Sequence, residues 1–138
     1  MTEPFRIFPI GIVKKQDETV RIEIYDEYSG GLLGLEGFSH IQVLFWFHEN
    51  DQSEKRAVLQ VHPRRDNRNP LSGVFATHSP VRPNLIGLTL CSIMSIEGNT
   101  IYIEDIDALD NTPVIDIKCY IPHSVAESQV RVPEWVYS

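Results

Sequence analysis

The sequence has few cysteines, no regularly spaced histidines and no long hydrophobic segment. Its two cysteines lack a C-x-x-C partner, which excludes a zinc ribbon and favours buried free thiols. The five histidines show neither H-x-H nor H-x-x-x-H spacing, so no metal site is expected. The longest apolar run, residues 41–47, is interrupted by Gln42 and is far shorter than the roughly 18–20 residues of a membrane helix.

Signals for export and for common enzyme sites are also missing. The first residues contain no basic segment followed by an apolar one, so no signal peptide is predicted and the cytoplasm is the expected location. Neither G-x-G-x-x-G nor G-x-x-x-x-G-K-[ST] occurs, and a G-x-S-x-G elbow is absent as well. A dinucleotide site, a P-loop and hydrolysis by a serine nucleophile therefore have no support.

Basic residues are scarce overall but unevenly placed. Lys and Arg number 12 against 19 Asp and Glu, which gives a net charge of −7. Residues 55–82 nevertheless hold six basic side chains and one acid, whereas residues 97–116 hold six acids and neither Lys nor Arg. The basic segment has two interpretations, a contact for a phosphate backbone or an ordinary solvated loop.

Apolar residues recur at every second position, which is typical of strands with one buried face. The pattern covers residues 20–24, 101–104 and 114–121, and in the last segment Ile115, Ile117 and Cys119 share a face. Residues 41–47 are apolar at nearly every position, which predicts a strand buried on both faces. Glu-Gly-Asn at 97–99 predicts a hairpin turn. Further strands are predicted at residues 5–13, 58–62, 73–76 and 88–93.

Helical signals are limited to single turns within residues 33–40 and 124–129. Many short strands joined by loops rich in Gly, Pro and Asn favour an all-β fold. A chain of 138 residues is long enough for one domain with its own core. We therefore expect a single small β-barrel domain with short helical turns over residues 1–138, its core at about 5–122 and a C-terminal extension at 123–138.

The loop near residues 77–84 carries the most unusual chemistry. Pro80 and Pro83 fix φ and make the loop rigid, and rigid loops on a sheet are where binding groups often lie. An ordinary polar turn, in which Ser and Asn only cap the backbone, is the alternative. The polar side chains of this loop are Thr77, His78, Ser79, Arg82 and Asn84.

Two further segments place polar groups beside predicted strands. Asp110 and Thr112, if exposed, suit ribose hydroxyls or an amino group, and Asp116 and Lys118 share one strand face, as a simple ion pair or as ligand contacts. His48 and Glu49 follow the apolar strand directly. They mark either the mouth of a pocket or only the return of the chain to water.

Four segments in this order resemble the TsaA-like family, also called the TrmO or YaeB-like family. They read GFSHI at 37–41, LFWFH at 44–48, GVFATHSPVRPNLIG at 73–87 and DNTPVIDIK at 110–118. The resemblance covers most of the chain, from about residue 7 to 122. It implies a β-barrel that binds S-adenosylmethionine, commonly as a homodimer. It also implies methylation of N6 of threonylcarbamoyladenosine at position 37 of tRNA, the reaction of the family's characterised bacterial members.

The resemblance also implies site residues, although it designates no catalytic side chain. The implied cofactor-binding residues are His48, Glu49, His78, Leu90, Asp110, Asn111, Thr112 and Pro113. Arg82, Pro83 and Asn84 match the family's R-P-N core. With these, the candidates for substrate or loop contacts are Thr77, Asp116, Lys118, Arg64 and Arg65.

The chain departs from the family pattern at several positions. His78 stands where Arg is usual, Leu85 and Cys119 stand where Pro is usual, and Asn111 stands where Gly is usual. Asn111 fits if its φ is positive. The P-R-Q-x-G segment and the C-terminal domain of longer members are missing from this sequence. These departures bear on the substrate more than on the cofactor.

Four functions remain to be compared. The first is a tRNA methyltransferase without a bound metal. The second is a methyltransferase with a small-molecule or protein substrate, which the acidic balance favours. The third is a non-enzymatic S-adenosylmethionine-binding module, and the fourth is a metal-dependent barrel enzyme, which the histidine spacing opposes.

Overall fold

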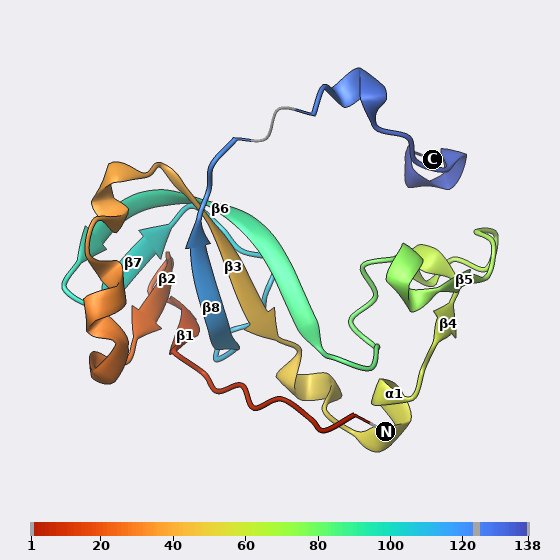
Figure 1. Cartoon of the computed structure of the whole chain (residues 1–138), viewed down its shortest axis with the longest axis horizontal. Helices are drawn as coiled ribbons and strands as arrows, with labels where there is room; N and C mark the ends of the chain where they lie inside the picture. The colour runs from red at the N-terminus through yellow and green to blue at the C-terminus, as the bar shows by residue number, and fades with distance from the viewer. Residues whose placement is uncertain (1, 123–124, 138) are drawn as a thin grey trace.

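The computed structural model describes residues 2–122 and 125–137, and its centre is a closed antiparallel β-barrel (Figure 1). The strands follow one another around the barrel in the order β1-β2-β7-β6-β3-β8. This confirms the predicted all-β barrel. The barrel strands are β1 (Gly11–Gln16), β2 (Thr19–Ile24), β3 (His40–Trp46), β6 (Ile86–Glu97), β7 (Thr100–Ile103) and β8 (Pro113–Cys119).

The remaining elements are short. Strands β4 (Gln60–Val61) and β5 (Ser72–Gly73) form a separate two-stranded sheet, and α1 (Ser53–Arg56) is a single helical turn. The predicted strand at 73–76 is wrong beyond Gly73, because residues 74–76 close a 3₁₀ turn. The 3₁₀ helices are Asp26–Leu32, Leu35–Gly37, His48–Asn50, Pro63–Arg65, Val74–Ala76, Glu127–Gln129 and Glu134–Tyr137. Ser124, the first residue of the predicted turn at 124–129, lies outside the described residues.

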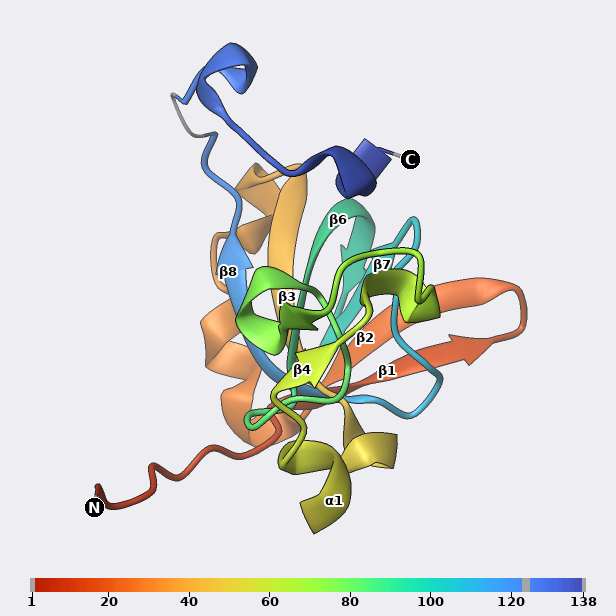
Figure 2. The same ribbon diagram turned by 90° about the vertical axis from the view of Figure 1, so that its right-hand side faces the viewer.

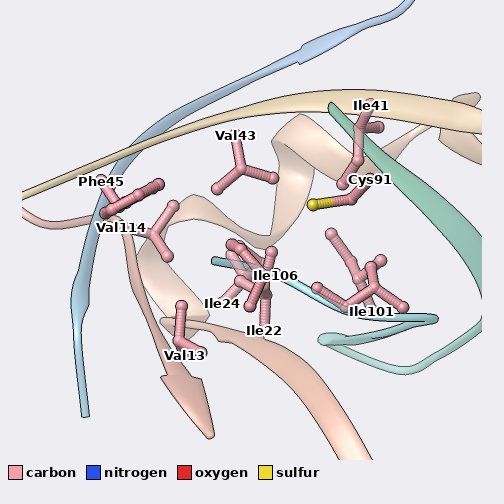
Figure 3. Packing of buried hydrophobic residues seen from close by; sticks show 11 residues of the cluster. Val13, Ile22, Ile24, Ile41, Val43, Phe45, Cys91, Ile101, Ile106 and Val114 are labelled. Atoms are coloured by element: carbon pink, nitrogen blue, oxygen red, sulfur yellow. The ribbon is translucent and has the colours of Figure 1, made fainter. Parts of the chain in front are cut away.

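Branched aliphatic side chains fill the barrel (Figure 3). Along β3, Ile41, Val43 and Phe45 are buried, while the residues between them are half-buried on the outer surface. The prediction that 41–47 is buried on both faces is therefore wrong, because a closed barrel has only one interior. Cys91 also points inward, and burial, with a smaller contribution from Asp105, raises the pKa of its thiol to about 11. A protonated interior thiol is not a nucleophile at neutral pH.

A β-bulge changes which residues of β8 face the interior. Ile117 lies opposite Val43, but the register then shifts, so that Val114 rather than Ile115 lies opposite Phe45. Val114 is fully buried and Ile115 only half-buried. The predicted shared face is thus wrong for Ile115, because the bulge adds one residue to the strand.

The first strand begins later than predicted. Residues 2–9 form no strand, and β1 begins at Gly11. A Cβ atom at Gly11 would lie 2.5 Å from the carbonyl oxygen of Glu23, so the close approach of β1 to β2 requires glycine here. The predicted hairpin at 97–99 is confirmed between β6 and β7, with Gly98 at a φ of 60°.

Residues 47–85, which connect β3 to β6, form a lobe beside the barrel (Figures 1 and 2). After β8 the chain turns back, and residues 125–137 run over this lobe. Among the described residues, no helix is both long and apolar enough to cross a membrane. The same part of the chain holds no group of three or more His, Cys, Asp or Glu side chains arranged to bind a metal.

Candidate functional site

Three strands bring the sequence-predicted residues to one end of the barrel. The end of β3 lies beside the start of β6, where Trp46 pairs with Ile86, and beside the start of β8, where Phe45 pairs with Val114. His48 and Glu49 follow β3, Asn84 precedes β6 and residues 110–112 precede β8. Segments far apart in sequence therefore meet at this end.

The loop at residues 110–113 is fastened to β1. The Asp110 carboxylate accepts a hydrogen bond from the Lys15 amide at 2.8 Å through Oδ1. The Asn111 amide donates to the Val13 carbonyl at 2.8 Å, and the φ of Asn111 is 67°. This is the left-handed conformation, which Asn tolerates better than most residues and which allows Asn to stand where the family usually has Gly. The second carboxylate oxygen of Asp110, Oδ2, takes no part in the hydrogen bond to Lys15.

Thr112 does not have the exposure that the sequence interpretation assumed. Its side chain is only 3% exposed, and its carbonyl accepts a hydrogen bond from the Val13 amide at 2.9 Å. Burial places Thr112 beneath the loop, where it supports the neighbouring residues. Asn111 is the exposed residue of this loop, and Asp110 and Pro113 are half-buried.

The loop at residues 77–82 is organised by its own polar groups. The Arg82 guanidinium donates through Nη1 to the carbonyls of Thr77 and Ser79, both at 3.2 Å. The Thr77 hydroxyl donates to the Val74 carbonyl at 2.9 Å and accepts from the Ser79 amide at 3.1 Å. Thr77 and Arg82 therefore hold the loop in shape, whereas His78 is exposed at its tip.

A second layer of residues fixes that loop to the end of β3, and the sequence interpretation missed it. Asn50 donates to the Pro80 carbonyl at 3.1 Å, and Arg56 donates to the Pro83 carbonyl at 2.8 Å. The Arg56 guanidinium also lies 5.3 Å from the ring centre of Trp46. The position of Asn50 directly after the Trp-Phe-His-Glu segment was the available signal for that residue. These side chains hold the loop against the segment that follows β3.

Leu90, Asp116 and Lys118 lie on the outer face of the barrel. Gln42 of β3 pairs with Leu90 on one side and with Lys118 on the other, and Leu44 pairs with Asp116. Leu90 is 51% exposed. Asp116 and Lys118 form no ion pair with each other within the described residues, and the Asp116 carboxylate accepts instead from the Ile117 amide at 2.9 Å.

Arg64 and Arg65 follow β4 in the lobe, within the 3₁₀ helix Pro63–Arg65. They share the lining of a groove with Thr77 and His78. The loop at residues 77–82 is therefore bonded to Asn50 after β3 and also lines this groove. The structure does not bring the two arginines into contact with the loop at 110–113.

The protein is thus a small closed antiparallel β-barrel with anchored polar loops gathered at one end. The model of the tRNA-methyltransferase O N-terminal domain matches residues 4–125, and the chain belongs to this family, as the sequence motifs predict. The solved structure of TrmO from P. aeruginosa superposes with a TM-score of 0.73 at 26% identity, covering 98% of this chain and 63% of that chain.

Two curated relatives align with this chain over very different shares of their own length. A probable S-adenosyl-L-methionine-binding protein of Methanocaldococcus jannaschii is 51% identical over 112 residues, which cover 81% of this chain and 89% of that protein. The tRNA (adenine(37)-N6)-methyltransferase of Homo sapiens is 43% identical over 114 residues, which cover 83% of this chain but only 25% of the human protein.

Proposed function

We propose that this protein is an S-adenosylmethionine-dependent methyltransferase acting on N6 of adenine 37 in tRNA, with threonylcarbamoyladenosine as the acceptor. The observation that carries the proposal is the meeting of the polar loops at one end of the barrel. The chain that forms this end belongs to a family named for tRNA methylation. The names of the archaeal and human relatives support the cofactor and the tRNA substrate, respectively. A tRNA substrate favours a cytoplasmic location.

The residues at the barrel end suit this cofactor. S-adenosylmethionine carries a sulfonium and an ammonium charge, and carboxylates stabilise such cations over a short distance. Asp110 has one oxygen outside its hydrogen bond to Lys15, and Glu49 is exposed. We assign the cofactor to His48, Glu49, His78 and the 110–113 loop, in which Thr112 is buried and contributes as a support. Leu90, on the outer face of the barrel, is assigned as an apolar contact.

The protein's contribution to the reaction is positioning and exclusion of water. The cofactor supplies a methyl group on a sulfonium sulfur. The N6–methyl bond would form as the sulfur–methyl bond breaks, with S-adenosylhomocysteine as the leaving thioether and the N6 proton passing to water. The Arg82 hydrogen bonds and the Arg56–Pro83 contact keep the 77–84 loop rigid, which lowers the entropic cost of aligning the two reactants.

We also propose that a second copy of the chain covers the outer face of β6. Leu88, Leu90 and Met94 are 63%, 51% and 70% exposed along this single strand, and such an apolar row is typical of an association surface. Leu90 belongs to the proposed cofactor set, so a homodimer joined here would border the cofactor site. Sedimentation equilibrium of the wild type and of a Leu88→Lys variant tests this, with a dimer expected only for the wild type.

The experiment that tests the function is a binding and methylation series on Asp110→Asn. This variant keeps the shape of the loop but removes the negative charge, so S-adenosylmethionine should bind at least about tenfold more weakly, as expected for loss of a charged hydrogen-bond partner. Asp107→Asn is the matched control, because Asp107 is exposed and outside the proposed set. Wild-type protein that gains no thermal stability from S-adenosylmethionine or S-adenosylhomocysteine would contradict the proposal.

A further inference from the structure

A groove of about 700 Å³ lies between the lobe and the C-terminal segment. Its walls come from three parts of the chain: residues 61–65, residues 76–81 and residues 132–136. The C-terminal segment reaches this place by turning back over the lobe (Figures 1 and 2). The volume lies within the range of roughly 300–1,000 Å³ that is usual for small-molecule sites.

The lining of this groove combines an aromatic surface with cations. Val61, Val81, Val132 and Trp135 provide apolar walls. Arg64 lies 5.9 Å from the ring centre of Trp135 and donates to the carbonyl of the same residue at 3.3 Å. The guanidinium therefore lies over one face of the aromatic ring. Proteins use this pairing to stack a nucleic-acid base while a cation meets the phosphate.

The turn that carries the two arginines has an unusual backbone. Arg64 and Arg65 have φ values of 61° and 56°, the left-handed region that residues other than glycine rarely adopt. Pro63 is buried, and the Arg65 amide donates to the His62 carbonyl at 3.1 Å, so the turn is fixed from inside. Strain of this kind is often kept where function needs a particular arrangement.

The charge of the groove contrasts with the rest of the protein. The chain carries a net charge of −7, but the charged side chains that line the groove are both basic, Arg64 and Arg65. Arg65 is exposed and makes no side-chain hydrogen bond or ion pair within the described part of the chain. A polyanion is therefore attracted to this side of the molecule and repelled by the remainder.

We propose that the groove binds one unpaired nucleotide of the RNA substrate, with its base against Trp135 and its phosphate at Arg65. This inference rests on the proposed function. Because His78 belongs to the proposed cofactor set and also lines the groove, the bound nucleotide is a neighbour of the methylated one. The 77–82 loop thus borders both the methyl donor and the flanking base.

Tryptophan fluorescence tests this directly, because the chain has two tryptophans and a Trp46→Phe variant leaves Trp135 as the only emitter. Thermal melts and circular dichroism first establish that this variant is folded. Titration with an anticodon stem-loop RNA should then quench the emission saturably, because a base stacks on the indole. A duplex RNA of equal length, without unpaired bases, should quench far less. Equal signals from both, or no quenching at RNA concentrations that support methylation, would overturn the proposal.

Steady-state kinetics separates the groove from the cofactor site. Trp135→Ala should raise the KM for RNA by about tenfold or more, the usual effect of losing one base–aromatic stack, and leave the Kd for S-adenosylmethionine unchanged. Trp135→Phe should retain most of the affinity. Tyr137→Ala is the matched control, since Tyr137 is 84% exposed in the same segment and does not line the groove.

The outcomes for the two proposals are distinguishable. If Trp135→Ala methylates RNA at the wild-type rate with an unchanged or lower KM for RNA, the groove assignment is overturned. The proposed methyltransferase function is then unaffected. A wild type that binds S-adenosylmethionine but methylates no tRNA would overturn the proposed function. In that case, saturable quenching by the stem-loop still supports the groove, and absence of quenching refutes it.

Arg65→Gln should remove one phosphate contact. The slope of log affinity for RNA against log salt concentration should therefore fall by about one.

Discussion

The barrel and the lobe of residues 47–85 are held together by different interactions. In the barrel, Ile22, Ile41 and Ile101 are completely buried and the strands pair around the full circle. In the lobe, Val74 and Leu85 are buried, and side chains also bind backbone carbonyls, as Arg56 does at Pro83 and Asn50 does at Pro80. Apolar burial tolerates few changes of volume, whereas single hydrogen bonds contribute modestly. The barrel therefore supplies stability, and the lobe supplies the shape of the site.

The largest expected effect comes from overfilling the barrel. In Gly87→Ala, the new Cβ would lie 2.4 Å from two carbons of the Phe45 ring, so Phe45 must move within a packed core. We expect the free energy of unfolding to fall by about 1–3 kcal/mol, measured by urea denaturation. Gly73→Ala in the lobe is the matched control, because its nearest non-neighbouring atom is 3.8 Å away. Equal stability of the two variants would contradict this difference between barrel and lobe.

A smaller and more local effect is expected from the lobe. Arg56→Ala removes the bond to the Pro83 carbonyl, the pair with Asp51 at 3.3 Å and the contact with the Trp46 ring. We expect a loss of about 1–2 kcal/mol, seen mainly as faster hydrogen exchange at residues 77–85 while the barrel strands stay protected.

The control for this variant is Arg68→Ala. Arg68 is exposed and its side chain pairs with Asp66, two residues away in sequence. The guanidinium of Arg68 lowers the pKa of the Asp66 carboxyl, but such surface pairs contribute little to stability. Faster exchange throughout the barrel in Arg56→Ala would show that the lobe and the barrel unfold as one unit.

The same division explains how much the sequence could predict. Alternating apolar residues indicated the barrel strands, because their burial depends only on neighbours in the strand and on one interior. The bulge at Ile115 was not predictable, since it depends on pairing with Phe45 of a distant strand. Motifs identified the residues around the site. Their roles changed in the structure, because Thr112 is buried beneath its loop and Arg82 binds its own loop rather than projecting outward.

The smallest expected effect concerns Asn111, where the loop of the site meets the barrel. Its φ of 67° costs roughly 1–2 kcal/mol for most residues but little for glycine. Asn111→Ala should therefore lose about 1 kcal/mol in the free energy of unfolding. Asn111→Gly should be nearly neutral, because relief of the backbone offsets loss of the 2.6 Å hydrogen bond from Lys14.

The two Asn111 variants also distinguish an effect on folding stability from an effect on S-adenosylmethionine binding. Neither changes the core, so any loss of S-adenosylmethionine affinity in Asn111→Ala reports displacement of Asp110 rather than unfolding. Isothermal titration below the melting transition measures this affinity. If Asn111→Ala binds the cofactor as tightly as Asn111→Gly, the backbone conformation at 111 serves only the fold, and the position of Asp110 tolerates a relaxed loop.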